Sequence, residues 1–186
     1  MEKYKYTKTW FLNSEIRHLL HKYLDTNITN KILEIGCYEG LSSIFFADNF
    51  IDNEHSSLTL VDPFLNINNN DHSIFLQNNE ELTFDYNLLQ CNNQNKIIIH
   101  KITSDTFFLN NTNTYNFIYI DGSHEIDQIT KDMENSFNIL EKNGIMWMDD
   151  YGGNNKIYDT MNVFLKKYET KYELLHSNYQ LAIKKI

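Results

Sequence analysis

Proline and cysteine are scarce in this sequence, and long apolar runs are absent. Its 186 residues include one proline, Pro63, and two cysteines, Cys37 and Cys91. Two cysteines at this spacing form neither a disulfide framework nor a metal-binding motif, so we expect buried thiols in a reducing compartment. No stretch approaches the roughly 20 apolar residues of a membrane helix, and the opening MEKYKYTKTW lacks the apolar segment of a signal peptide. These scarcities predict a soluble cytoplasmic protein with no membrane partner.

Basic residues are also in the minority. Lysine and arginine together number 16 against 25 aspartates and glutamates, which gives a formal net charge of -9, and no dense basic block occurs. Because proteins bind nucleic acids largely by neutralising phosphates, this balance disfavours a DNA or RNA partner. Asparagine-rich runs such as NINNN fit polar loops and carry no functional signal. At this length we expect a single domain, residues 1–186.

The apolar residues occur as short runs that alternate with amphipathic stretches. Seven runs have the length of strands, at residues 31–36, 58–62, 96–102, 116–121, 144–150, 172–177 and 179–186. Helical periodicity marks residues 14–24, with Ser14 as the N-cap, and residues 41–50, 80–91, 124–140 and 157–168. An N-terminal helical segment, residues 1–30, thus precedes a core of residues 31–186. Nearly all-apolar strands that alternate with helices predict an α/β fold with a mostly parallel, doubly wound sheet, closed by an antiparallel hairpin around Asn178.

In an open parallel sheet, ligands bind beyond the carboxyl ends of the strands, so residues at these ends are the candidates for a site. The first strand ends in LEIGCYEGLSS, which places Glu34, Gly36 and Gly40 at a strand-to-helix turn. Gly36 can form a tight turn, and Gly40 lets the backbone approach a ligand at the helix N-terminus. The pattern is neither G-x-G-x-x-G nor G-x-x-x-x-G-K-[ST], so nucleotide phosphates are not the expected ligand. Asp62 ends the second strand, where a carboxylate can accept both hydroxyl groups of a ribose.

These residues resemble the motifs of the class I S-adenosylmethionine-dependent methyltransferases. The motif E/D-x-G-x-x-x-G is matched by Glu34, Gly36 and Gly40, and the acid that ends the second strand is matched by Asp62. The resemblance covers most of the domain and implies a Rossmann-like sheet of seven strands in the order 3-2-1-4-5-7-6, with S-adenosyl-L-methionine as the cofactor. It also implies that Glu34 lies near the methionine part and that Asp62 holds the ribose. The cofactor-binding residues implied in this way are Glu34, Gly36, Tyr38, Gly40, Ser42, Asp62, Ser104, Asp105 and Asp121.

Three further acids end the fourth and fifth strands. Asp121 follows NFIYI, and Asp149 and Asp150 follow GIMWM. If these strands are parallel neighbours joined by a crossover helix, their ends lie roughly 5 Å apart and the three carboxylates converge. A hard divalent cation, Mg²⁺ or else Mn²⁺, would offset their repulsion and leave positions for two adjacent substrate hydroxyl groups. His124, just beyond Asp121, could take the proton of such a hydroxyl, so it is the candidate catalytic base.

The spacing of these residues resembles the metal-dependent small-molecule O-methyltransferases, and the macrocin-type sugar O-methyltransferases in particular. IDGSH matches their strand-four D-x-x-H motif, and MDDY matches their strand-five acidic pair. The resemblance implies that Asp121, Asp149 and Asp150 bind magnesium, that His124 is the base, and that a sugar or nucleotide sugar is the acceptor. A homo-oligomer is compatible with it. Catechol-type enzymes carry lysine in place of His124 and Asp-Asn in place of Asp149 and Asp150, so this chain departs from them at both places. Trp10, which precedes the first helix, fits packing better than contact with an acceptor.

Other functions stay open at this point. One alternative is the same methyl transfer with a catechol or phenol as the acceptor. Another is a partner subunit that binds S-adenosylmethionine but is catalytically inactive. The D/N-P-P-Y/F loop of amino-methylating nucleic-acid enzymes cannot occur, because the only proline is Pro63. Ser104 and Asp105, which the resemblance puts near the adenine, fit a helix N-cap equally well. Acceptor recognition is expected in residues 63–82 and before residue 14.

Overall fold

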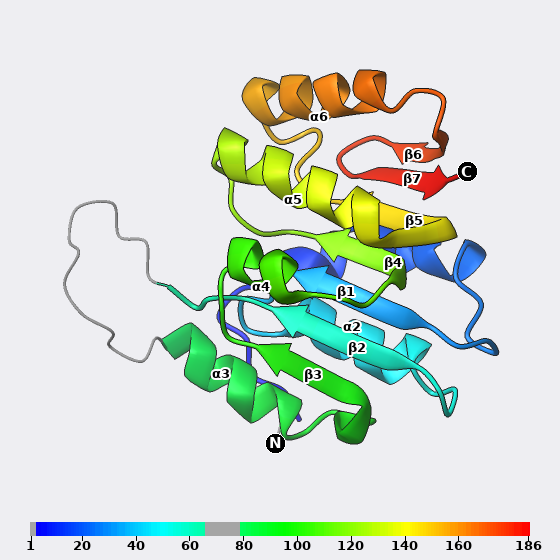
Figure 1. The fold of residues 1–186 in the computed structure, drawn as a ribbon. Coiled ribbons are helices and arrows are strands. Elements are labelled where there is room, and N and C mark those ends of the chain that lie inside the picture. Colours follow the sequence, from blue (N-terminus) through cyan, green and yellow to red (C-terminus); the bar gives the residue numbers. More distant parts are fainter. Residues whose placement is uncertain (1–2, 66–78) are drawn as a thin grey trace.

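The computed structural model describes residues 3–65 and 79–186. Within these residues the chain forms a seven-stranded sheet with helices on both faces (Figure 1). The strand order is β3-β2-β1-β4-β5-β7-β6, which confirms the predicted order. The strands are β1 Lys31–Ile35, β2 Ser57–Val61, β3 Ile97–His100, β4 Tyr115–Ile120, β5 Leu140–Met148, β6 Tyr172–Ser177 and β7 Leu181–Lys185.

The central strands end at a common level. β1 to β5 pair in parallel, and the ladders align Ile35 with both Val61 and Ile120, and Ile120 with Met148. The residues that follow each strand therefore leave the sheet along the same edge. β7 runs antiparallel to β5 and to β6, which confirms the C-terminal hairpin.

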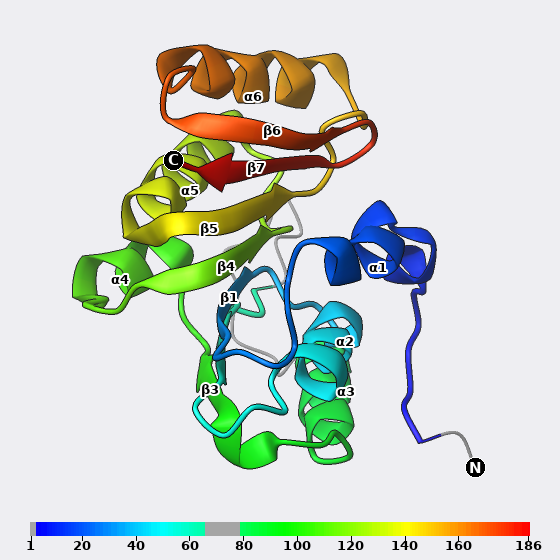
Figure 2. The same ribbon diagram turned by 90° about the vertical axis from the view of Figure 1, so that its right-hand side faces the viewer.

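The helices form one layer on each face of the sheet. α1, α2 and α3 pack on one face, and α4, α5 and α6 pack on the other (Figure 2). Among the described residues, no helix combines the length and hydropathy needed to cross a membrane. The helices are η1 Trp10–Asn13, α1 Glu15–Leu19, η2 Leu20–Lys22, α2 Leu41–Phe50, α3 Asn79–Leu88, η3 Gln94–Lys96, α4 Ser104–Asn110, α5 Ile126–Ile139 and α6 Asn155–Lys167.

The central strands are largely apolar because both of their faces are covered. In β4, Phe117 and Tyr119 belong to the core beneath α1 and α2, whereas Ile118 and Ile120 belong to the core beneath α5 and α6. All four side chains are buried. Successive strand residues point to opposite faces, so a strand between two helical layers carries no polar alternation.

The N-terminal helix differs from its prediction. Residues 14–24 were expected as one amphipathic helix, but α1 ends at Leu19 and continues as the 3-10 turn η2. Ser14 stands at the N-cap position, yet its hydroxyl group donates to the carbonyl oxygen of Phe11 at 2.8 Å and caps no helix N–H group. Of the segment 63–82, predicted to recognise the acceptor, residues 66–78 lie outside the described residues.

Candidate active site

The turn between β1 and α2 packs directly against the end of β4. Gly36 and Gly40 have φ angles of +86° and +84°, a region that glycine adopts without a steric penalty. A Cβ atom on Gly36 would lie 1.9 Å from the carbonyl oxygen of Asp121. The backbone N–H of Asp121 in turn donates to the carbonyl oxygen of Ile35 at 2.8 Å. The glycine turn predicted to bind the cofactor and the first of the predicted metal ligands are therefore in contact.

Asp62 shapes this turn from the end of β2. One carboxylate oxygen accepts the backbone N–H groups of Cys37 and Tyr38, at 2.7 and 3.0 Å, and the other accepts that of Phe64 at 2.7 Å. A carboxylate offers about four acceptor positions, so three bonds leave little room for ribose hydroxyls. In this conformation Asp62 supports the turn, and its predicted contact with a ribose stays a prediction.

Glu34 is completely buried beneath the turn. Its Oε1 accepts the hydroxyl group of Ser42, while its Oε2 has no hydrogen-bond partner among the described residues. Burial raises the pKa of Glu34 to about 8, so its carboxyl group is largely protonated at neutral pH. Tyr38 and Ser42 line the neighbouring cavity, whereas Glu34 lies behind them.

Ser104 and Asp105 start α4 and face α5. The side-chain amide of Gln128 donates to both, at 3.0 and 3.2 Å, and Lys131 contacts Asp105 at 3.1 Å. The N-cap of α4 is Thr103, whose hydroxyl oxygen accepts from the backbone of Thr106. Neither predicted adenine-contacting residue lines the cavity described below.

The acids that end β4 and β5 meet, as predicted. One ligand atom from each of Asp121, His124 and Asp150 lies within 4.8 Å of the other two, a grouping able to hold a metal ion. His124 Nε2 lies 2.8 Å from Asp150 Oδ2, and the hydroxyl group of Tyr179 donates to Asp150 Oδ1 at 2.8 Å. The structure thus brings the predicted base, His124, among the predicted metal ligands.

Asp149 lies beside this group and is held by three donors. Its carboxylate accepts the side-chain amide of Gln180 at 3.0 Å, the backbone N–H of Asp150 at 2.9 Å and the hydroxyl group of Tyr119 at 3.1 Å. The same Tyr119 hydroxyl lies 3.2 Å from Asp121 Oδ2, so it bridges the two carboxylates. Asp149 is therefore the most firmly supported acid of the three.

The electrostatics of this cluster favour a cation. Burial, followed by the negative charges of Asp149 and Asp150, raises the pKa of Asp121 well above its usual range. Burial also raises the pKa of Asp149. Carboxyl groups placed this close together retain protons unless a positive charge offsets their repulsion.

A cavity of about 700 Å³ joins the glycine turn to the acids. Its wall also contains residues that pattern analysis did not select: Lys8, Glu39 and Tyr179. Trp10 lines the cavity with its side chain 71% exposed and stacks near Tyr38, with ring centroids 5.7 Å apart, so it does more than pack. No local signal marks these residues, because they reach the cavity only through the tertiary fold.

The N-terminal arm, residues 3–9, is tied to the cofactor turn by two buried polar side chains. The Glu39 carboxylate accepts the backbone N–H and the hydroxyl group of Thr7, each at 2.6 Å. The Asn87 amide bonds to both the N–H and the carbonyl of Lys5, and donates to the carbonyl of Glu39 at 2.9 Å. This arm carries Lys8 to the cavity, and the contact of residues before position 14 with an acceptor stays a prediction.

The sheet is parallel except for β6 and the inserted β7, and the glycine turn faces the acids at the ends of β4 and β5. This arrangement is a Rossmann-like fold of the methyltransferase type. Residues 33–151 match a family model described as a methyltransferase domain. The match spans more than half of the chain, and the protein belongs to this family. No curated protein sequence matches the chain.

Solved structures share this fold at low sequence identity. An rRNA methylase from Streptococcus thermophilus is similar with a TM-score of 0.65 and 10% identity, over 98% of this chain and 99% of that one. The O-methyltransferase from Bacillus cereus, determined in complex with SAH, is similar with a TM-score of 0.65 and 11% identity, over 96% of this chain and 82% of that one. The O-methyltransferase TomG from Streptomyces achromogenes is involved in tomaymycin synthesis and was determined in complex with SAM. It is similar with a TM-score of 0.65 and 12% identity, over 92% of this chain and 78% of that one.

Proposed function

We propose that the protein is a divalent-metal-dependent O-methyltransferase that transfers the methyl group of S-adenosylmethionine to a hydroxyl group of a sugar or similar vicinal diol. The observation that carries this proposal is the meeting of Asp121, His124 and Asp150 within 4.8 Å, in the cavity that also contains the glycine turn. An electrophile bound at the turn and a hydroxyl group bound at the acids would face each other across one enclosed space. Positioning of this kind supplies much of the rate gain in group transfer.

The residues at the glycine turn fit the cofactor. Gly36 lies so close to the backbone of Asp121 that no side chain could stand there, so the turn is held against the end of β4 at the edge of the cavity. Glu34 Oε2 is a buried polar atom without a hydrogen-bond partner among the described residues, beneath the region assigned to the methionine part. S-adenosylmethionine supplies a sulfonium methyl group that is already electrophilic, and O-methyltransferases in complex with SAM or SAH share this fold. These features support Glu34 and the turn as the cofactor end of the cavity.

The acidic cluster fits a hard cation. The grouped ligand atoms come from the carboxylates of Asp121 and Asp150 and the imidazole of His124, and the Asp149 carboxylate adjoins Asp150. Sets dominated by carboxylate oxygens favour Mg²⁺ or Mn²⁺. When bound, the cation would offset the carboxylate charge and acidify an adjacent hydroxyl group. Asp149, held by three donors, would keep its orientation while Asp121 and Asp150 adjust.

His124 is the proposed base. Its side chain is 67% exposed at the cavity and can reach a hydroxyl group bound beside the acids. In the reaction the acceptor oxygen gains the methyl group, its proton passes to the imidazole, and S-adenosylhomocysteine leaves. The contact between His124 and Asp150 orients the ring for this role.

The acceptor is proposed to be a small molecule such as a sugar or nucleotide sugar. Trp10 offers an exposed ring face on the cavity wall, and Lys8 lies above that ring at 5.6 Å from its centroid.

A catechol is the second candidate for the acceptor. Phenols ionise near pH 10, so they depend less on a base than sugar hydroxyls do. Loss of His124 should therefore harm sugar methylation more than catechol methylation.

The decisive test combines binding and turnover. Calorimetric titration of the purified protein with S-adenosylhomocysteine and with Mg²⁺ or Mn²⁺ would be followed by a screen of nucleotide sugars and catechols for methyl transfer. Asp121→Ala and Asp149→Ala should abolish metal-dependent turnover while S-adenosylhomocysteine affinity stays nearly unchanged. Asp127→Ala, which removes an exposed acid on the first turn of α5, is the matched control.

Three outcomes would change the proposal. Loss of S-adenosylhomocysteine binding in either acid variant would overturn the assignment of the acids to the metal. Cofactor binding without any metal response or methyl transfer would indicate an inactive binding subunit. His124→Gln should lower kcat and keep metal affinity, and a loss of metal affinity instead would make His124 a ligand.

A further inference from the structure

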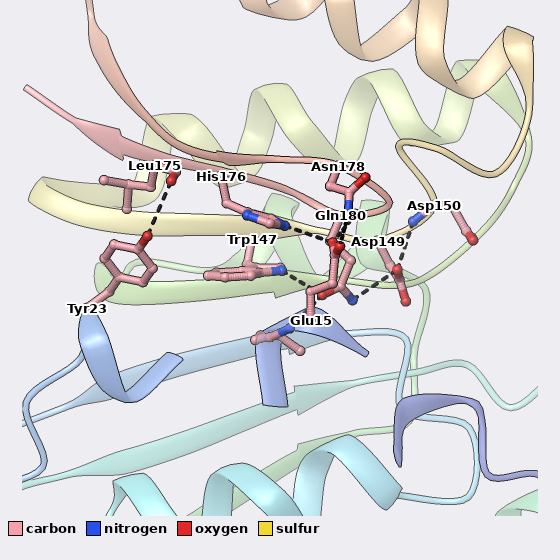
Figure 3. A network of polar contacts seen from close by, with 10 residues as sticks. Glu15, Tyr23, Trp147, Asp149, Asp150, Leu175, His176, Asn178 and Gln180 are labelled. Atoms are coloured by element: carbon pink, nitrogen blue, oxygen red, sulfur yellow. Dashed lines mark hydrogen bonds and ion pairs between the residues drawn. The ribbon is translucent and has the colours of Figure 1, made fainter. Parts of the chain in front are cut away.

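Gln180 is a buried residue whose side chain bonds to three residues in two distant parts of the chain, α1 and the end of β5 (Figure 3). Its Oε1 accepts the backbone N–H of Ile16 at 2.8 Å and the indole N–H of Trp147 at 3.0 Å. Its Nε2 donates to Asp149 Oδ1 at 3.0 Å. Because Oε1 must face two donors, only the NH₂ end of the amide can face the carboxylate. The orientation of Gln180 is thus determined by its neighbours.

The same residue joins α1 to the hairpin of β6 and β7. Its backbone N–H donates to Glu15 Oε2 at 2.9 Å, and Glu15 also contacts His176 Nε2 at 2.8 Å and the amide of Asn178 (Figure 3). The N–H of Ile16 belongs to the first turn of α1, where backbone donors have no partner within the helix. Gln180 supplies that partner from the other end of the sequence.

Asp149 transmits this arrangement to Asp150. Asp149 Oδ1, which receives the Gln180 amide, also accepts the backbone N–H of Asp150 at 2.9 Å. Asp150 has a φ angle of +61°, a left-handed conformation that is uncommon for residues other than glycine. In that conformation its carboxylate lies 2.8 Å from His124. A rotation of the Asp149 carboxylate would therefore release the turn that aims Asp150 into the cavity.

We propose that Gln180 is a positioning residue that fixes Asp149 and, through it, Asp150 for cation binding, and that it couples α1 to this end of the cavity. The inference rests on the proposed function, because it assigns a role toward the cation that the acids would bind. Residues that hydrogen-bond to metal-binding carboxylates commonly affect metal affinity by about 10–100-fold. A merely structural Gln180 would affect the stability of the protein and leave cation affinity unchanged.

The test compares Gln180→Met with two control variants. Gln180→Met keeps the side-chain volume and removes the amide. Trp147→Phe removes the other side-chain partner of Gln180 and keeps its contact with Asp149. Asn178→Ala removes a neighbouring contact of the hairpin with Glu15. Mn²⁺ affinity is measured by calorimetry and by electron paramagnetic resonance, S-adenosylhomocysteine affinity reports folding, and thermal unfolding reports stability.

Gln180→Met should weaken Mn²⁺ binding by about 10–100-fold while S-adenosylhomocysteine affinity is kept. Both controls should keep Mn²⁺ affinity even where stability falls. If Gln180→Met does not fold, Gln180→Asn, with an amide one methylene shorter, takes its place. Unchanged Mn²⁺ affinity in the folded variant overturns the positioning role and leaves the proposed function intact. A wild-type protein that binds S-adenosylhomocysteine but no Mn²⁺ overturns the metal dependence, and this inference with it.

Discussion

Among single residues, Glu34 combines complete burial with an ionisable group. Its neighbours provide one hydrogen bond, from Ser42, and leave the other oxygen unpaired among the described residues. An ionised carboxylate in such a place lacks the hydration that the unfolded chain provides, so the native protein retains the proton. The proton is retained up to about pH 8, against 4.5 for the ordinary group.

This difference predicts how stability depends on pH. Between pH 4.5 and about 8 the native state binds a proton that the unfolded state has released, so the free energy of unfolding falls as pH rises through this window. The slope from this group approaches roughly 1.4 kcal/mol per pH unit. Glu34→Gln should remove that slope, so the variant gains stability relative to wild type as pH rises from 5 to 8. Urea unfolding of both proteins at several pH values measures the difference, and parallel curves would contradict the buried protonated carboxyl.

Among the elements, the turn between β1 and α2 is the most tightly constrained. Gly36 has both a positive φ angle and a backbone atom of Asp121 within 1.9 Å of the position of a Cβ atom. Gly122, on the facing turn, has no positive φ angle, and its nearest atom, Ile35 Cγ2, would be at 3.4 Å. Gly36 and Gly122 both lie where these two turns meet, but only Gly122 has room for a side chain.

An alanine substitution at each glycine tests this constraint. Gly36→Ala should destabilise the protein by at least about 1–2 kcal/mol from its backbone conformation alone, with the clash against Asp121 in addition. It should also weaken S-adenosylhomocysteine binding, because the turn must move away from β4. Gly122→Ala should stay close to wild type in its unfolding midpoint. Equal midpoints for the two variants would show that the turn is not constrained as described.

Helices and hairpins were predicted correctly where the apolar periodicity was strong, and less well where the periodic segment was short. The segment expected as a helix at residues 124–140 is α5, Ile126–Ile139, and the pattern around Asn178 is the β6–β7 hairpin. Residues 14–24 became α1 and η2, because apolar spacing does not separate an α-helical turn from a 3-10 turn. The start of α1 is instead held by Gln180, a contact between residues 164 positions apart in the chain.

At the scale of the whole molecule, the formal net charge of -9 argues against RNA as the acceptor. Its fold is shared by an rRNA methylase as well as by O-methyltransferases, so fold alone does not choose the acceptor. The charge of this chain bears on the choice, since RNA affinity depends on phosphate neutralisation.

We therefore expect no binding of RNA at physiological salt. Fluorescence anisotropy of labelled rRNA fragments should show no saturation at micromolar protein, and labelled S-adenosylmethionine should leave RNA unmodified while it methylates a small diol. A basic, structurally related RNA-binding protein serves as the positive control. Salt-dependent, saturable binding would contradict the charge argument and favour an RNA acceptor.

The sequence by itself determined the sheet, the strand-end residues and the charge. Short, nearly all-apolar strands between helices specify a covered parallel sheet. The ends of neighbouring parallel strands lie at the same edge, so the sequence was enough to place Asp121 beside the Asp149–Asp150 pair. Only the tertiary structure decided how they are used. β7 enters the sheet beside β5 and brings Tyr179 and Gln180 to acids some 30 positions earlier in the chain. The contact from Gln180 orients Asp149, and the contact from Tyr179 orients Asp150. No local sequence pattern predicts these two contacts, because they depend on the insertion of β7 beside β5.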